Sequence, residues 1–301
     1  MGQLSISLDL DDRDPEAVED ACFAAGAVSV VLTDQRDDAI LEPEPGEIRL
    51  WPATRLQAIF PAELASAESL VQLATVIGCR LDELTVANVP QKAWEREWLK
   101  DFVPMRFGEA LWICPSHAEV TADHAVVLKL DPGLAFGTGT HPTTRLCLEF
   151  IDGAPREGGL VVDYGCGSGV LALAALSCDP TARALVHDID PQALIATRDN
   201  AEANNLGARI EYFDDPERLL VRTRPQGAEL VLANILSGPL CDLAPRLCAC
   251  VAPGGTLVLA GLLSEQANEV IAAYRSRIAL SRWRELDGWV CLVGRKAGSA
   301  A

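Results

Sequence analysis

Val161-Val162-Asp163-Tyr164-Gly165-Cys166-Gly167-Ser168-Gly169 is the stretch that decides the fold of the larger part of this chain. An apolar run ends in an acid, glycines then alternate with small residues, and the apolar segment Val170–Leu176 follows. Glycines at this spacing let the backbone turn sharply and approach a ligand closely. The pattern predicts a strand, a ligand-binding turn and a helix, which together open a Rossmann-like sheet.

Two features of this turn indicate which ligand it binds. The glycines are spaced GxGxG, without the third glycine of the dinucleotide pattern GxGxxG. Asp163 stands directly before the turn, where an anionic pyrophosphate would favour uncharged amides. S-adenosylmethionine has no phosphate and carries a sulfonium and an ammonium, so an acid is favourable beside it. We therefore predict S-adenosylmethionine as the cofactor, with Asp163, Gly165 and Gly167 in its site. The acid disfavours the alternatives of a nucleotide-binding dehydrogenase or a non-catalytic binding module.

Two further strand ends carry polar residues. Leu185-Val186-His187-Asp188 closes the next strand, about twenty residues on, where a carboxylate can accept both hydroxyls of a cofactor ribose. Asn234 follows Leu232-Ala233 at the end of a later strand, where its carbonyl oxygen can orient a donor nitrogen. Active sites of open α/β sheets lie at the carboxyl ends of their strands. We expect Asp188 to bind cofactor and Asn234 to act at the reacting centre. An N-cap for Asp188 and a turn residue for Asn234 are the structural alternatives.

The strands around this turn define the larger domain, residues 108–301. Strands are predicted at Leu160–Tyr164, Ala184–Asp188, Ile210–Phe213, Glu229–Ala233 and Thr256–Ala260, with helical patterns between most of them. This alternation predicts a doubly wound, mostly parallel α/β sheet. The chain ends with Arg282–Asp287, Gly288 and Trp289–Gly294, which predict an antiparallel hairpin. A parallel sheet finished by an antiparallel strand is the methyltransferase variation on the Rossmann fold.

Residues 1–90 predict a separate small α+β domain. Alternation marks strands at Leu4–Leu10 and Arg55–Phe60, and apolar, mostly β-branched runs mark Ala27–Thr33 and Leu84–Val89. Asp14 and Pro15 predict a helix start and Gly26 its end, and Leu64–Ile77 has helical spacing. The order βαββαβ is ferredoxin-like. Residues 91–107 then predict a linker helix, because Trp94, Trp98 and Phe102 recur four residues apart.

Composition excludes several classes of protein. The net charge of −18 disfavours direct binding to nucleic acid, which needs a basic face. Residues 1–90 contain 17 acidic and 5 basic residues, a net charge of −12, which suits a basic partner. No stretch approaches the roughly 20 apolar residues of a membrane span, and the N-terminus lacks the pattern of a signal peptide. No pair among the ten cysteines has CxxC spacing, so we expect reduced thiols, no metal and a cytoplasmic protein.

Several long motifs outside the glycine turn carry a resemblance to a known family. They are WEREW, PMRFGE and LWICP within Trp94–Pro115, the loop LDPGLAFGTGTHPTT at Leu130–Thr144, DYGCGSGVLALAA, DIDPQAL and ANILSGPL. Together they closely resemble the ribosomal protein L11 methyltransferase family. The resemblance runs from about residue 92 to the C-terminus, whereas residues 1–90 match mainly in layout. His187 is a departure, because the family usually has a small or aliphatic residue there.

The resemblance implies particular roles for matching residues. Thr144 resembles a cofactor-binding threonine, Gly165 the first glycine of the cofactor turn, Asp188 the ribose-binding acid and Asn234 the residue at the methyl-transfer site. The family methylates lysine side chains and the N-terminal amine of one large-subunit ribosomal protein, and its small N-terminal domain recognises that substrate. We expect a monomer. A methyltransferase for a small molecule or a glutamine side chain is the alternative, but Asn234-Ile235-Leu236-Ser237 stands where such enzymes often have NPPY.

Overall fold

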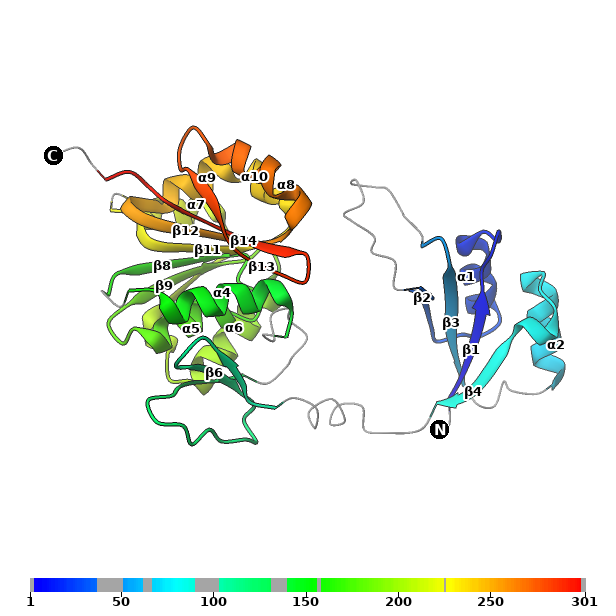
Figure 1. The fold of residues 1–301 in the computed structure, drawn as a ribbon. Helices are drawn as coiled ribbons and strands as arrows, with labels where there is room; N and C mark the ends of the chain where they lie inside the picture. The colour runs from blue at the N-terminus through cyan, green and yellow to red at the C-terminus, as the bar shows by residue number, and fades with distance from the viewer. Residues whose placement is uncertain are drawn as a thin grey trace. The chain divides into compact units, whose positions relative to one another are not determined.

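The computed structural model describes residues 3–36, 51–61, 67–89, 103–130, 140–155, 158–224 and 226–298. The chain divides into two compact units, Met1–Glu97 and Trp98–Ala301. Figure 1 shows each unit as a set of helices packed on its own sheet. One buried apolar cluster belongs to the small unit and two belong to the large one, so each unit has its own core.

The described part of the small unit is a four-stranded antiparallel sheet with two α-helices. Its elements are β1 (Gln3–Asp9), α1 (Pro15–Ala24), β2 (Ser29–Asp34), β3 (Thr54–Pro61), α2 (Ala67–Ile77), the 3-10 turn η2 (Leu81–Glu83) and β4 (Thr85–Val89). The strand order is β2-β3-β1-β4, and each neighbouring pair is antiparallel. Alternation in β1 buries Leu4, Ile6 and Leu8 with apolar side chains of α1 and α2. Asp14 caps α1 through the N–H of Glu16, as its position before Pro15 predicts.

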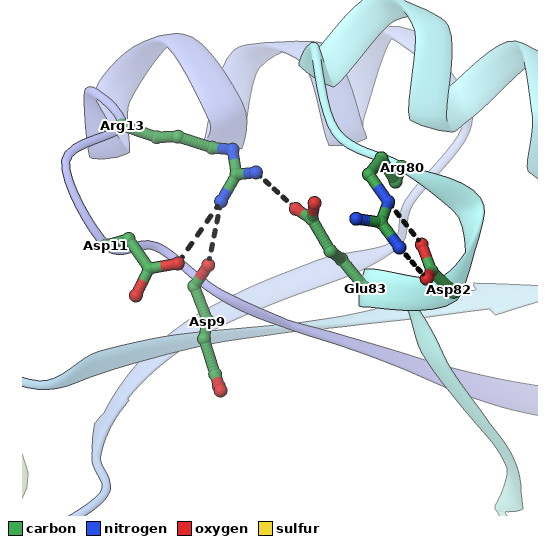
Figure 2. Close-up of polar contacts among 6 residues, drawn as sticks. All are labelled: Asp9, Asp11, Arg13, Arg80, Asp82 and Glu83. Carbon is green, nitrogen blue, oxygen red and sulfur yellow. Dashed lines mark hydrogen bonds and ion pairs between the residues drawn. The ribbon is translucent and has the colours of Figure 1, made fainter.

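A charged cluster joins the end of β1 to the turn before β4 (Figure 2). The Arg13 guanidinium donates to the Asp9 carbonyl oxygen at 3.1 Å and also pairs with the Glu83 carboxylate. The Asp11 carboxylate lies 3.7 Å from the same guanidinium. Arg13 therefore offsets part of the negative charge that β1 and η2 bring together.

The large unit contains, within its described residues, a seven-stranded sheet in the order β10-β9-β8-β11-β12-β14-β13. The strands are β8 (Leu160–Tyr164), β9 (Arg183–His187), β10 (Ile210–Phe213), β11 (Ala228–Asn234), β12 (Val251–Leu263), β13 (Leu280–Leu286) and β14 (Trp289–Arg295). Neighbours from β10 to β12 are parallel, whereas β14 is antiparallel to β12 and β13. The mixed α/β class with a mainly parallel sheet is thus as the sequence predicts.

Helices cover both faces of this sheet (Figure 1). One face carries α4 (Pro142–Gly153), α5 (Val170–Cys178) and α6 (Pro191–Ala203); the other carries α7 (Pro216–Thr223), α8 (Ser237–Asp242), α9 (Ala244–Cys250) and α10 (Ala267–Tyr274). The 3-10 turns η3 (Gly207–Arg209) and η4 (Ser264–Gln266) lead into β10 and α10. Helix α5 is apolar all round because it is buried all round. None of the helices in the described ranges is both long and apolar enough to cross a membrane.

A second, three-stranded sheet contains the last residues of the segment 91–107, which the sequence predicted as a linker helix. It consists of β5 (Met105–Phe107), β6 (Leu111–Cys114) and β7 (Val126–Lys129) in that order. Residues 90–102, with Trp94, Trp98 and Phe102, lie outside the described residues. Met105–Phe107, however, is a strand, so the helix prediction is wrong at its C-terminal end. Phe107 is fully buried and pairs with Leu111 across a tight turn, so strand pairing and burial decide the structure of Met105–Phe107.

Asp152 at the end of α4 stabilises that turn. Its carboxylate accepts the backbone N–H groups of Glu109 at 2.5 Å, Ala110 at 3.1 Å and Leu111 at 2.8 Å. A β-carbon at Gly108 would lie 2.3 Å from an Asp152 oxygen, and the φ of Gly108 is +66°. The glycine therefore gives the carboxylate room to reach the three amides.

The cysteines are free thiols, and eight of the ten are buried. Burial raises the pKa of the Cys248 and Cys250 thiols to about 11. Such thiols stay protonated near neutral pH and react poorly. Their use as small apolar core residues agrees with the sequence prediction.

Candidate active site

The glycine turn lies directly after β8. Its three glycines, Gly165, Gly167 and Gly169, all have left-handed φ values, +77°, +55° and +77°, which other residues rarely adopt. The N–H groups of Gly165 and Cys166 both donate to the carbonyl oxygen of His187, at 2.8 and 3.0 Å. The turn is therefore tied to the end of β9, the strand that precedes Asp188.

Helix α6 holds the turn from its other side, through residues that the sequence analysis did not identify. The Thr197 hydroxyl donates to the Gly167 carbonyl oxygen at 2.9 Å, and the Asn200 amide donates to the Ser168 carbonyl oxygen at 2.9 Å. Thr197 is fully buried. A threonine inside a helical pattern gives no local signal of this role, because the contact spans 30 residues.

Asp163 lies beneath the turn, fully buried. One carboxylate oxygen accepts the N–H of Ala172 at 3.0 Å, and the other has no hydrogen-bond partner among the described residues. The N–H groups in the first turn of a helix lack partners within the helix, and Gly169 at the N-cap has no side chain to supply one. Asp163 therefore caps α5. The pKa of Asp163 is raised to about 7, chiefly by burial; the hydrogen bond from Ala172 opposes this rise, and the nearby charge of Asp188 contributes to it. Direct contact with a cofactor stays a prediction.

Asp188 follows β9 at the same edge of the sheet, half-buried. Its carboxylate accepts the N–H of Gly167 at 2.9 Å and that of Asp190 at 3.0 Å, one on each oxygen. Each carboxylate oxygen can accept more than one hydrogen bond, so acceptor capacity for two ribose hydroxyls remains. The N-cap of α6 is Asp190, whose side chain accepts the N–H of Gln192. Asp190, and not Asp188, is therefore the N-cap of α6.

Asn234 ends β11 and meets the start of α4. Its amide nitrogen donates to the Thr144 hydroxyl at 3.4 Å, across 90 residues of sequence. Its amide oxygen is buried without a hydrogen-bond partner among the described residues. An unpaired buried carbonyl oxygen costs free energy, and an arriving amino group would relieve that cost. Thr144 and Asn234, which the sequence placed in one site, thus do lie together. Residues 131–139 of the threonine-rich loop lie outside the described residues.

The departure at His187 has a structural explanation. The side chain is buried and its Nδ1 lies 2.9 Å from the Phe213 carbonyl oxygen. Because a carbonyl can only accept, Nδ1 carries the proton. The ring also packs edge-on against Tyr164, with centroids 4.6 Å apart. The side chain of His187 therefore lies in the core, while its carbonyl oxygen accepts the hydrogen bonds from the glycine turn.

His141 is another residue that the sequence analysis missed. It is the N-cap of α4 and its Nδ1 accepts the N–H of Thr143. Its ring lies edge-on to Trp289 at the start of β14, with centroids 4.8 Å apart. This contact joins the helix that carries Thr144 to the C-terminal pair of strands. Within the described ranges, no group of three or more potential ligands is arranged to hold a metal ion.

These features define a class of protein. The carboxyl ends of parallel strands lie on the same side of a sheet. In this sheet they bring together Asp163, the glycine turn, Asp188 and Asn234. The register places Tyr164 beside His187 and Asp163 beside Leu232, two residues before Asn234. The residues fit S-adenosylmethionine: Asp188 retains acceptor capacity, the amide oxygen of Asn234 has no partner among the described residues, and hydrogen bonds from β9 and α6 fix the glycine turn. The fold and site are those of an S-adenosylmethionine-dependent methyltransferase, and not of a dehydrogenase.

Comparison with known proteins identifies the family. The model of the family described as "Ribosomal protein L11 methyltransferase (PrmA)" matches residues 3–297. A ribosomal protein L11 methyltransferase of Pseudomonas aeruginosa (strain LESB58) is 46% identical over 296 residues, covering 98% of this chain and 99% of that protein. The one from Azotobacter vinelandii is 47% identical over 294 residues, with 98% and 99% coverage. The chain therefore belongs to the ribosomal protein L11 methyltransferase family.

A solved structure agrees with this assignment. The crystal structure of a ribosomal protein L11 methylase from Lactobacillus delbrueckii subsp. bulgaricus is 26% identical and aligns with a TM-score of 0.58. The alignment covers 65% of this chain and all of that one. The mixed α/β fold is thus shared with a protein of the same family.

Proposed function

We propose that the protein transfers methyl groups from S-adenosylmethionine to ribosomal protein L11, at lysine side chains and at the N-terminal amine. The observation that carries this proposal is the buried, unpaired amide oxygen of Asn234 beside Thr144, at the sheet edge that holds the glycine turn. The names of the relatives support the substrate, since they are L11 methyltransferases.

Each residue of the site has a proposed part in binding. The backbone of Gly165 and Gly167 would pass close to the cofactor, and Asp188 would accept its ribose hydroxyls. Thr144 would contact the cofactor from the start of α4. Asn234 would accept a hydrogen bond from the amine that is methylated. Asp163 would act beneath the turn, by holding the first turn of α5.

Methyl transfer to an amine depends more on positioning of the reacting atoms than on acid–base groups of the protein. The cofactor supplies a methyl group on a sulfonium, which a neutral amine can displace in line. A lysine amine has an ordinary pKa of about 10.4, and desolvation in a closed site lowers that value. The amide oxygen of Asn234 accepts one N–H and thereby directs the nitrogen lone pair away from itself. Such orientation of reacting groups is worth several kcal/mol.

The small unit is proposed to recognise the protein substrate. Its topology supports a ferredoxin-like domain at residues 1–90. We propose residues 108–301 as the methyltransferase domain, to which β5 (Met105–Phe107) is added. Its exposed acids in the described ranges are Asp11, Asp12, Asp14, Glu16, Asp20, Glu68 and Asp82. They outnumber the exposed arginines there, which are Arg36, Arg55 and Arg80. An acidic surface attracts a lysine-rich partner and speeds its association. We further propose a cytoplasmic monomer that makes no direct contact with nucleic acid.

Mass spectrometry of purified L11 after incubation with the protein and S-adenosylmethionine tests the proposal. We expect methylated lysines and a methylated N-terminus, and an L11 with a blocked N-terminus should gain methyl groups only on lysines. L11 that stays unmodified would refute the function. Calorimetry with S-adenosylmethionine and with NAD tests the cofactor separately, and only the former should bind.

Charge reversal tests the proposed role of the small unit. Changing Glu16 and Asp20 on α1 to lysine should raise KM for L11 and leave affinity for S-adenosylmethionine unchanged. Changing Glu265 on η4 and Glu269 on α10 to lysine, also two exposed acids, is the control with the same change in charge. The effect should shrink as salt shortens the screening length from about 30 Å at 0.01 M to about 10 Å at 0.1 M. Equal effects of the α1 changes and the control changes would contradict recognition by the small unit.

A further inference from the structure

Hydrogen bonding holds the side chain of Asn234 only loosely. Among the described residues it makes one hydrogen bond, to the Thr144 hydroxyl at 3.4 Å, near the limit for such bonds. The main chain of Asn234 pairs with Ala260 of β12, and this pairing fixes its position along the strand direction. Something else must therefore fix the chain just beyond Asn234, and the next residue is Ile235.

The side chain of Ile235 presses on the cofactor turn. A β-carbon added at Gly165 would lie 2.4 Å from Cγ2 of Ile235. Carbon atoms in contact normally lie about 3.5–4.0 Å apart. The Ile235 methyl group thus occupies the space that any side chain at Gly165 would need, and it touches the first glycine of the turn.

The main chain of Ile235 is closely approached by Gly261 of β12. A β-carbon at Gly261 would lie 2.3 Å from the Ile235 carbonyl oxygen and 2.9 Å from its nitrogen. Gly261 has a φ of +89° and lies where the register of β12 with β14 shifts between Leu259 and Leu262. Such a bulge bends the strand, and here it brings Gly261 against Ile235.

We propose that Ile235 is a positioning residue, wedged between Gly165 and Gly261, that sets Asn234 relative to the cofactor turn. This inference rests on the proposed function. The branch at its β-carbon makes the wedge stiff, because a β-branched side chain has few χ1 rotamers. Because χ1 resists rotation, a displacement of Gly165 against Cγ2 is passed to the main chain of Ile235, which is joined directly to Asn234. A shift of the turn is therefore transmitted to the residue at the methyl-transfer point.

The shape of the side chain makes the proposal specific. Valine keeps both γ-carbons of isoleucine, so Ile235→Val preserves the contact with Gly165. Leucine has nearly the volume of isoleucine but a single γ-carbon, so Ile235→Leu removes the β-branch. If Ile235 only filled space, leucine would be the better replacement. If it acts as a wedge, valine is the better one.

Single-turnover methylation of L11, calorimetric affinity for S-adenosylmethionine and the melting temperature test this in the full chain. A misplacement of about 1 Å can slow a reaction about 100-fold. We expect Ile235→Leu and Gly261→Ala to slow the methyl-transfer step at least ~10-fold, with cofactor affinity changed less than ~3-fold. Ile235→Val should stay within ~2-fold of the unmodified protein. Ile195→Leu, the same exchange at a half-exposed position of α6, is the matched control and should change nothing.

A second comparison shows whether Ile235 acts through Asn234. In an Asn234→Ala background, Ile235→Leu should cost little further rate, because the residue it positions is gone. Equal slowing in both backgrounds, or an Ile235→Leu protein as fast as the Ile235→Val one, would overturn the proposal. If Ile235→Leu lowers the melting temperature, Ile235→Met takes its place with the same expectation, because methionine also lacks the β-branch and its flexible side chain adapts to the available space. If Asn234→Ala alone leaves the rate unchanged, it is the proposed role of Asn234 that fails.

Discussion

Replacing Asp163 by asparagine should make the protein more stable above neutral pH. The pKa of Asp163 rises from its ordinary 3.8 to about 7, first because burial penalises the charged carboxylate; the hydrogen bond from Ala172 opposes this and Asp188 adds to it. Between these values the unfolded chain has lost the proton and the folded protein still holds it. Folding then takes up a proton, so stability falls as pH rises through this window.

The size of the effect follows from the width of that window. About three pKa units at about 1.36 kcal/mol each give an upper bound on the order of 4 kcal/mol. Asparagine has nearly the same shape, keeps an oxygen for the N–H of Ala172 and has no charge to bury. The advantage of Asp163→Asn should therefore be small near pH 4, grow as pH rises, and level off above about pH 7.

Urea unfolding of both proteins, followed from about pH 4 to about pH 8, measures this difference. Groups that titrate alike in the two proteins cancel, so the difference curve reports Asp163 alone. A difference that does not vary with pH would show that the carboxylate is not held protonated in the folded protein. An asparagine variant that is less stable at pH 8 would show that the carboxylate charge stabilises the fold, against this reasoning.

Three further predictions concern single side chains. Asp188→Ala should weaken S-adenosylmethionine binding by about 1–3 kcal/mol, through lost charge-assisted hydrogen bonds; unchanged calorimetric affinity would remove the ribose assignment. Asn234→Ala should slow single-turnover methylation far more than it weakens cofactor binding, and a preserved rate would leave Asn234 a turn residue only. Asp152→Ala should destabilise the protein by about 1–3 kcal/mol, since three backbone N–H groups lose their acceptor; an unchanged melting temperature would contradict that capping role.

The candidate site could be predicted only where its residues are marked by local pattern. The acid and glycines of the turn, Asp188 after the next strand and Asn234 after a later one all follow strands that the sequence identifies. The same pattern did not show that Asp163 is buried as a helix cap. The contacts of Thr197 with Gly167 and of His141 with Trp289 were missed as well, because both join segments that are far apart in the sequence.

The sequence by itself determined the elements whose causes lie within a few residues. Asp190 before Pro191 starts α6, and the apolar run from Leu160 makes β8, because capping and alternation are local effects. Tertiary structure alone decided what meets across long separations. It joined Asn234 to Thr144, tied Thr197 to the glycine turn, and set Ile235 beside two glycines. Such contacts form only when distant segments pack together, and their energy depends on a fit between surfaces that no short stretch of sequence contains.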